Sequence, residues 1–168
     1  MRKQAVILGT ALSLLFVLTV AAQAAEKFAY VDLSRIFSEY GKTKDYDKTL
    51  GDKENLYTAE RDKKVSEVKS FQDKMNLLSE KEKEAKKADI ETKVKTLQDF
   101  DRQKQADLRK EQDEKMKEIL KNIEEATKKY SEKEGCTLVF NDRVLVYQNK
   151  SLDITNKILE ILNKEYKK

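Results

Sequence analysis

The apolar residues of this chain are widely spaced from Asp52 to Glu134, a stretch that contains neither glycine nor proline. Lys, Glu and Gln fill much of it, and these residues favour helix while they remain in contact with water. A single helix of that length would extend for roughly 125 Å, because each residue adds about 1.5 Å. A chain of this size cannot enclose such a helix. The pattern therefore predicts a projecting rod or a helical hairpin, with the helical region covering 42–134.

The apolar positions of the first arm favour the hairpin. Near its far end they step by 3, 4 and 3 residues, which is the spacing of a helix–helix seam: Val68, Phe71, Met75 and Leu78. Earlier in the arm Arg61 and Lys64 occupy the corresponding positions, so looser contact between the arms is expected there.

The run from Ser79 to Ala88 (SEKEKEAKKA) has no large apolar residue and lies midway along the helical region. It predicts the hairpin tip near 79–89, with Asp89 capping the returning helix. On the returning arm four apolar residues recur every 11 positions: Leu97, Leu108, Ile119 and Tyr130. That period is typical of a straight or slightly right-handed rod. Periodicity alone fits a generic coiled-coil spacer equally well, so the flanking segments have to decide the function.

The segment before the arms predicts a buried strand and a short helix. Lys27–Leu33 (KFAYVDL) is apolar on both faces, with Phe28 and Tyr30 on one of them. Asp32 or Ser34 can cap a short helix that ends at Tyr40. Gly41 then marks a bend before the first arm.

The segment after the arms predicts two further strands and a last helix. Gly135 is a helix stop, and Cys136–Phe140 and Val144–Tyr147 are β-rich runs that 141–143 can join as a hairpin. Asp153 is the expected N-cap of the closing helix, with its carboxylate accepting a backbone N–H.

These elements predict an α+β fold that is mostly helical, in which a β-body formed by 25–41 and 135–168 carries one long coiled-coil hairpin. The body alone is too small to bury a sufficient core, and its strands are apolar on both sides. We therefore expect several copies to share one core. The residues expected in this oligomer body are Phe28, Tyr30, Val31, Leu138, Phe140, Val144, Val146 and Tyr147.

The N-terminus has the pattern of a secretory signal peptide. Arg2 and Lys3 precede an apolar run, Ala5–Val20, and Ala22-Gln23-Ala24 places small residues where a signal peptidase cuts. The apolar run is shorter than the roughly 20 residues that span a membrane. We expect cleavage after Ala24 (signal peptide 1–24, one domain 25–168) and a protein that is exported and then soluble. An uncleaved anchor is the alternative.

Composition argues against several classes of protein. Charged residues make up 39%, His is absent and there is one Cys. The usual neutral-pH base, a Cys-based zinc site and an internal disulfide are therefore unavailable, and no residue group suggests a catalytic or cofactor site. The four glycines are isolated, so no phosphate-binding loop is expected. After cleavage 33 basic and 31 acidic residues would remain, a net charge of +2 that does not indicate nucleic-acid binding.

The combined pattern resembles the Skp/OmpH family of periplasmic chaperones over nearly all of the mature chain. The motifs that carry the resemblance are the opening FAYVDLSRIF, the charged helical insert, GCTLVF, VLVY, and the closing SLDITNKILEILNK. The resemblance implies a jellyfish-shaped homotrimer in the periplasm whose hairpins surround a cavity. It also implies an ATP-independent holdase that keeps unfolded outer-membrane proteins from aggregating. A structural coiled-coil protein of the envelope without chaperone activity is the alternative.

Two features of the arms bear on that function. The apolar cluster near the tip either packs the hairpin or forms a client wall: Phe71, Met75, Leu77 and Leu78. Well-studied members of the family are strongly basic and have been linked to anionic lipid and lipopolysaccharide. Here the lysines from Lys81 to Lys87 alternate with Glu80, Glu82 and Glu84, so only a weak contact of that kind, or a solvated charged tip, is expected.

Overall fold

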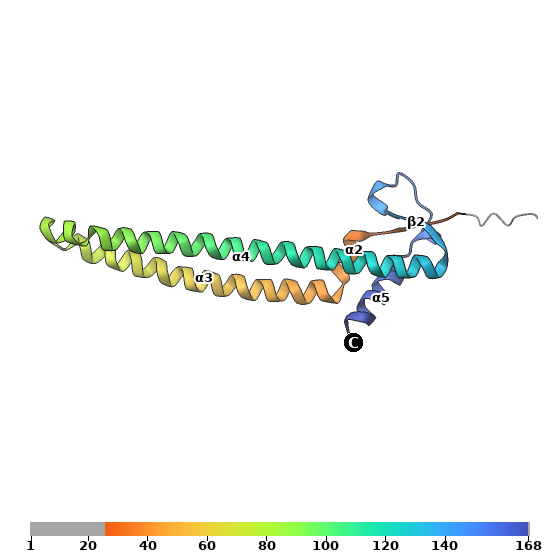
Figure 1. Ribbon diagram of the computed structural model, residues 1–168, viewed down its shortest axis with the longest axis horizontal. Helices are drawn as coiled ribbons and strands as arrows, with labels where there is room; N and C mark the ends of the chain where they lie inside the picture. Colours follow the sequence, from red (N-terminus) through yellow and green to blue (C-terminus); the bar gives the residue numbers. More distant parts are fainter. Residues whose placement is uncertain (1–25, 168) are drawn as a thin grey trace, which may run out of the picture.

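A long helical hairpin dominates the computed structural model of the chain, which describes residues 26–167. The expected signal peptide lies outside these residues. Helix α3 (Gly41–Asn76) runs out from the body, and α4 (Glu80–Glu134) returns beside it (Figure 1). Because α4 is the longer helix, its C-terminal part continues past α3 into the body. The predicted hairpin is therefore confirmed.

The tip of the hairpin is a tight turn at Leu77–Ser79, earlier and shorter than the expected 79–89. Ser79 is the N-cap of α4, and the Glu82 carboxylate accepts hydrogen bonds from its backbone N–H at 3.0 Å and its hydroxyl at 2.5 Å. These hydrogen bonds lower the pKa of Glu82. The charged run after Ser79 thus forms the first turns of α4, and the prediction that Asp89 caps this helix is wrong.

The two strands of the body pair in parallel, although the whole helical insert separates them in sequence. Strand β1 (Lys27–Val31) lies against β2 (Cys136–Asn141), with Ala29 opposite Val139 and Tyr30 opposite Phe140. The expected β-hairpin between Cys136–Phe140 and Val144–Tyr147 is wrong. Asp142–Val144 is a single 3-10 turn, and Leu145–Tyr147 is not a strand. The 3-10 turn that follows β2 does not fold the chain back along the open edge of that strand, so the later β-rich run has no strand partner within residues 26–167.

The two short body helices begin at sites that the sequence located closely. Helix α2 (Leu33–Glu39) is capped by Asp32, whose carboxylate accepts from the Arg35 N–H at 2.8 Å. Helix α5 (Thr155–Tyr166) begins one residue later than expected, so its N-cap is Ile154 and the assignment of Asp153 to that position is wrong. Asp153 instead makes a bridge to Tyr30 in the extended chain before the helix. Its carboxylate does accept the N–H of Thr155, at 2.9 Å.

The hydrophobic core lies entirely in the body. It is built from β1, α2, the C-terminal part of α4 and α5; its largest fully buried apolar side chains are Ile36, Ile119 and Ile158. Within the described chain, no residue between Thr43 and Ile119 is buried. The two arms therefore pack against each other without forming a buried core. Over residues 26–167 no helix combines the length and apolar character that crossing a membrane requires.

Candidate client and assembly surfaces

Three of the four tip residues singled out from the sequence pack between the arms. Phe71, Met75 and Leu78 are partly buried, and the Lys93 Nζ of α4 lies 5.5 Å from the centroid of the Phe71 ring. Leu77 differs, because it sits in the turn and is 87% exposed. The structure thus divides the predicted client wall into a packed seam and one apolar side chain that faces solvent.

The middle of the hairpin is joined by an aromatic and polar cluster. Tyr57 lies against Phe100 with ring centroids 5.9 Å apart, and its hydroxyl donates to the Asp101 carboxylate at 3.1 Å. Arg61 pairs with the other oxygen of Asp101 at 3.3 Å. Sequence reasoning missed Phe100, although it follows Leu97 at helical spacing. The looser seam expected here is therefore a solvent-exposed contact, which hydrogen bonds and an ion pair stabilise.

An ion-paired carboxylate fastens the root of the arms. The Glu118 carboxylate of α4 forms two ion pairs. Its oxygens lie 2.8 Å from the Lys115 Nζ of the same helix and 2.5 Å from the Lys42 Nζ at the start of α3. These two ammonium groups lower the pKa of Glu118 to about 2. The Lys42–Glu118 ion pair therefore holds the start of α3 against α4, where the hairpin leaves the body.

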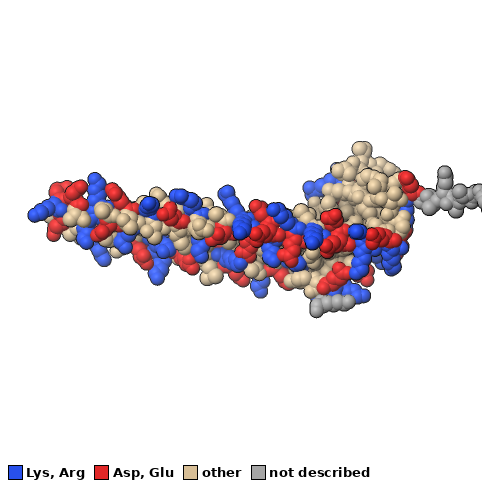
Figure 2. Space-filling model, in the orientation of Figure 1, with Lys and Arg blue, Asp and Glu red and all other residues tan. Residues whose placement is uncertain are grey.

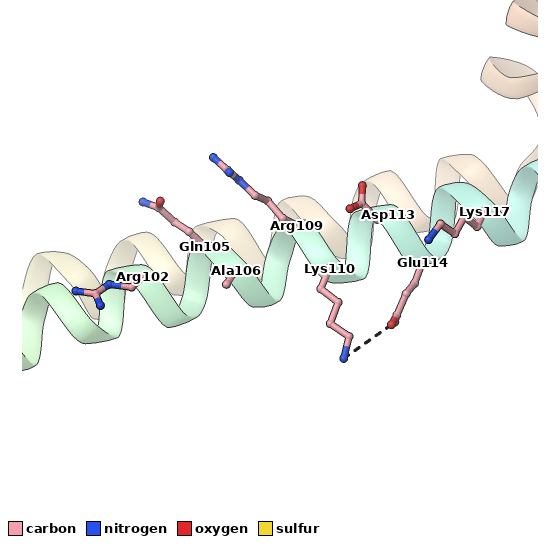
Figure 3. A pocket seen from close by; sticks show the side chains of 8 residues that line it. All are labelled: Arg102, Gln105, Ala106, Arg109, Lys110, Asp113, Glu114 and Lys117. Atoms are coloured by element: carbon pink, nitrogen blue, oxygen red, sulfur yellow. Dashed lines mark ion pairs between the residues drawn. The ribbon is translucent and has the colours of Figure 1, made fainter.

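The outer surface of the arms is shallow and carries both signs of charge. A shallow, open depression along α4 is lined by that helix alone. Figure 3 shows the Lys110–Glu114 ion pair on one side of the helix and Arg109 with Asp113 on the other. Lysine, arginine and carboxylate side chains alternate along the visible face of both arms (Figure 2). Across residues 26–167 no group of three His, Cys, Asp or Glu side chains is placed to hold a metal ion. What the arms offer is an extended surface for weak contacts.

Most of the residues predicted for the oligomer body form an exposed apolar surface. Tyr30 and Val31 are buried within the chain. The other six are exposed: Phe28, Leu138, Phe140, Val144, Val146 and Tyr147. Figure 2 shows a largely uncharged region on the body, where Figure 1 places β2 and the loop after it. An apolar area of this kind is typical of a surface that another molecule covers.

The chain thus combines a long hairpin of paired helices with a small body that exposes an apolar surface. The family model described as "Outer membrane protein (OmpH-like)" matches residues 27–162, and the chain belongs to this family.

A solved structure has the same fold. It is the crystal structure of a candidate OmpH-like outer membrane chaperone from Caulobacter crescentus CB15, with a TM-score of 0.76 and 12% sequence identity. The similarity covers 84% of this chain and 86% of that one. At this identity the likeness concerns the fold. A search of curated proteins finds no match.

Proposed function

We propose that this protein is an ATP-independent periplasmic holdase that binds unfolded outer-membrane proteins and prevents their aggregation. The observation that carries the proposal is the construction of the arms, which have no buried residue between Thr43 and Ile119 and so leave their side chains available to a partner. Membership of the OmpH-like family and the likeness to a candidate outer membrane chaperone support it.

The arms suit a disordered client because no single contact on them is strong. Partly buried apolar side chains lie beneath a mixed layer of lysine and glutamate. Both kinds of side chain can give a client chain weak, interchangeable contacts. Binding and release then need no covalent step and no nucleotide. An unfolded barrel protein would be held by the sum of many contacts.

Assembly into a homotrimer completes the proposal. The exposed apolar residues of the body would be covered by other copies, and the arms of the copies would enclose the space in which a client lies. The signal-peptide pattern at 1–24 supports a location in the periplasm. The expected weak contact with anionic lipid or lipopolysaccharide stays a prediction, since the tip carries both charge signs.

The test shortens both arms without changing the body or the turn at Leu77–Ser79, although it removes Phe71 from the seam near the tip. Contacts of Arg61 with Asp101 and of Phe71 with Lys93 define the register, so excising 61–71 and 90–100 removes facing segments. Each excision takes out 11 residues, about three helical turns or ~16 Å, and keeps the remaining faces aligned. We expect the shortened protein to assemble normally but to lose most of its ability to keep a denatured outer-membrane barrel from aggregating.

Light scattering and circular dichroism of the shortened protein serve as controls for assembly and helix content. A shortened trimer that protects the barrel as well as the full-length protein would exclude the arms as the client surface. A full-length protein that protects no client at all would favour the structural coiled-coil alternative.

A further inference from the structure

A cleft lies on the body between the C-terminal part of α4 and α5, which Figure 1 shows crossing beside it. We call it the lysine cleft; it has a volume of about 310 Å³. Its lining comes from these two helices alone: Lys129, Tyr130, Lys133, Ile161, Lys164 and Glu165. This volume is at the small end of clefts that bind ligands. The lysine cleft therefore suits a group of one or two residues rather than a long segment.

The floor of the lysine cleft is apolar and belongs to the body core. Tyr130 and Ile161 are partly buried, and both pack against the buried core residues while they also line the cleft. Because the core holds these two side chains, the floor is in place before any ligand arrives. A ligand then does not have to order this apolar surface when it binds.

The rim of the lysine cleft carries an excess of positive charge. Three lysines and one glutamate line it, which leaves a local net charge of +2. Glu165 is already occupied, because it forms an ion pair with Lys129 across the two helices. Lys133 reaches only the carboxylate of its neighbour Glu134, at 3.9 Å, and Lys164 forms no ion pair within residues 26–167. Two ammonium groups, one from each helix, are therefore available to an anion.

We propose that the lysine cleft binds the C-terminal end of an unfolded client chain whose last residue is large and apolar. The carboxylate would pair with Lys133 and Lys164, and the last side chain would lie on Tyr130 and Ile161. A C-terminal residue carries its carboxylate and its apolar side chain on the same Cα, so both can reach a site where cations border an apolar floor. An internal Asp or Glu has no apolar group beside its carboxylate.

The inference rests on the proposed function and adds one defined contact to it. The arms offer many interchangeable contacts, none of which distinguishes one part of a client from another. A chain has a single C-terminal end, so the lysine cleft would fix where one end of a held client lies.

The test is fluorescence anisotropy with a short Gly-Ser peptide that is labelled at its N-terminus and ends in phenylalanine with a free carboxylate. Two matched peptides end in an amidated phenylalanine or in glycine with a free carboxylate. Amidation removes the charge and glycine removes the apolar group. We expect the first peptide to bind about tenfold more tightly than either control. Equal binding of the free and amidated peptides would overturn the proposal.

The matching protein variants remove the two available cations. Lys133→Gln with Lys164→Gln should weaken the binding of the free-acid peptide about tenfold. The control, Lys121→Gln with Lys157→Gln, removes one exposed lysine from each of the same two helices and changes the net charge equally. Circular dichroism should show both variants folded, because all four side chains lie on the surface. Equal weakening by the two variants would indicate a general charge effect and refute the site.

A photo-cross-link locates the bound peptide. A peptide that ends in benzoylphenylalanine keeps both the carboxylate and the apolar group, and we expect it to label residues in 129–133 or 161–165. Labelling confined to the arms would contradict the proposal. Binding of laurate at the same two lysines without any binding of the peptide would assign the cleft to a lipid carboxylate and also overturn it.

The outcomes separate this inference from the proposed function. A protein that protects a denatured barrel but does not bind the free-acid peptide would refute the lysine cleft alone. A protein that binds the peptide at the cleft but protects no client would refute the holdase and leave a site for chain ends.

Discussion

The contrast between a dry body and wet arms predicts that one type of substitution has two different costs. Ile119 and Leu97 belong to the same 11-residue stripe of α4, but Ile119 is 1% exposed in the body core and Leu97 is only partly buried in the arm. Replacing either by alanine removes three carbon atoms. The comparison therefore keeps the helix and the number of deleted carbon atoms constant and varies the environment.

The expected magnitudes follow from burial. Three fully buried carbon groups are worth about 2.4 kcal/mol in transfer free energy, and a rigid surround adds a cavity cost, so Ile119→Ala should destabilise the protein by about 3–4 kcal/mol. Solvent can fill the space left at Leu97, and part of this side chain is already wet. Leu97→Ala should therefore cost about 1–2 kcal/mol.

Urea unfolding followed by helical circular dichroism, at one fixed chain concentration, measures both losses. Hydrogen exchange adds the local view, because amides around Leu97 should open more readily than those around Ile119 in the same helix. Equal losses for the two variants, or uniform protection along α4, would refute the claim that the stability of the hairpin comes from the body.

Three further predictions concern single contacts. The stabilising ion pairs of Glu118 should be complete above about pH 4.5 and lost as the pH falls towards 2. In urea titrations, Glu118→Gln should abolish this acid-dependent loss of stability. The loss should be under about 1 kcal/mol, because the carboxylate is 40% exposed. Thr155→Val should cost about 2 kcal/mol in thermal unfolding, since the buried hydroxyl accepts the Asp32 N–H at 2.9 Å, whereas Ser34→Ala on the exposed side of α2 should change little. Ser79→Ala should increase amide exchange in the first turn of α4 without shifting global unfolding, because the tip lies far from the core.

The arms could be predicted from the sequence because their signals are local. Helix-favouring composition, the absence of breakers and the 11-residue stripe all lie within the stretch that they describe. The tip lies earlier than predicted, because the stretch after Ser79 lacks apolar residues as a loop does but forms solvated helix. The capping chemistry of Ser79 and Glu82 was the better signal, since it states where a helix begins.

The body could be predicted only in part, because strand partners are not local. Val144–Tyr147 has β-favouring residues, but composition does not supply an adjacent strand. The parallel pairing of β1 with β2 joins segments on opposite sides of the whole insert, and no nearby residue indicates it. Most residues predicted to lie in a shared oligomer core are exposed in the single chain, and their burial between copies stays a prediction.

The parallel pairing of β1 with β2 also sets an order for folding. Closing the flexible loop between Val31 and Cys136 would cost on the order of 4 kcal/mol in entropy before any strand contact formed. Contacts across the turn at Leu77–Ser79 are close in sequence, so the hairpin can begin there and zip towards the body. Each step shortens the effective loop, until β2 arrives beside β1 as the last event. We therefore expect the rate of folding to depend on the arms and the free energy of unfolding to depend on the body.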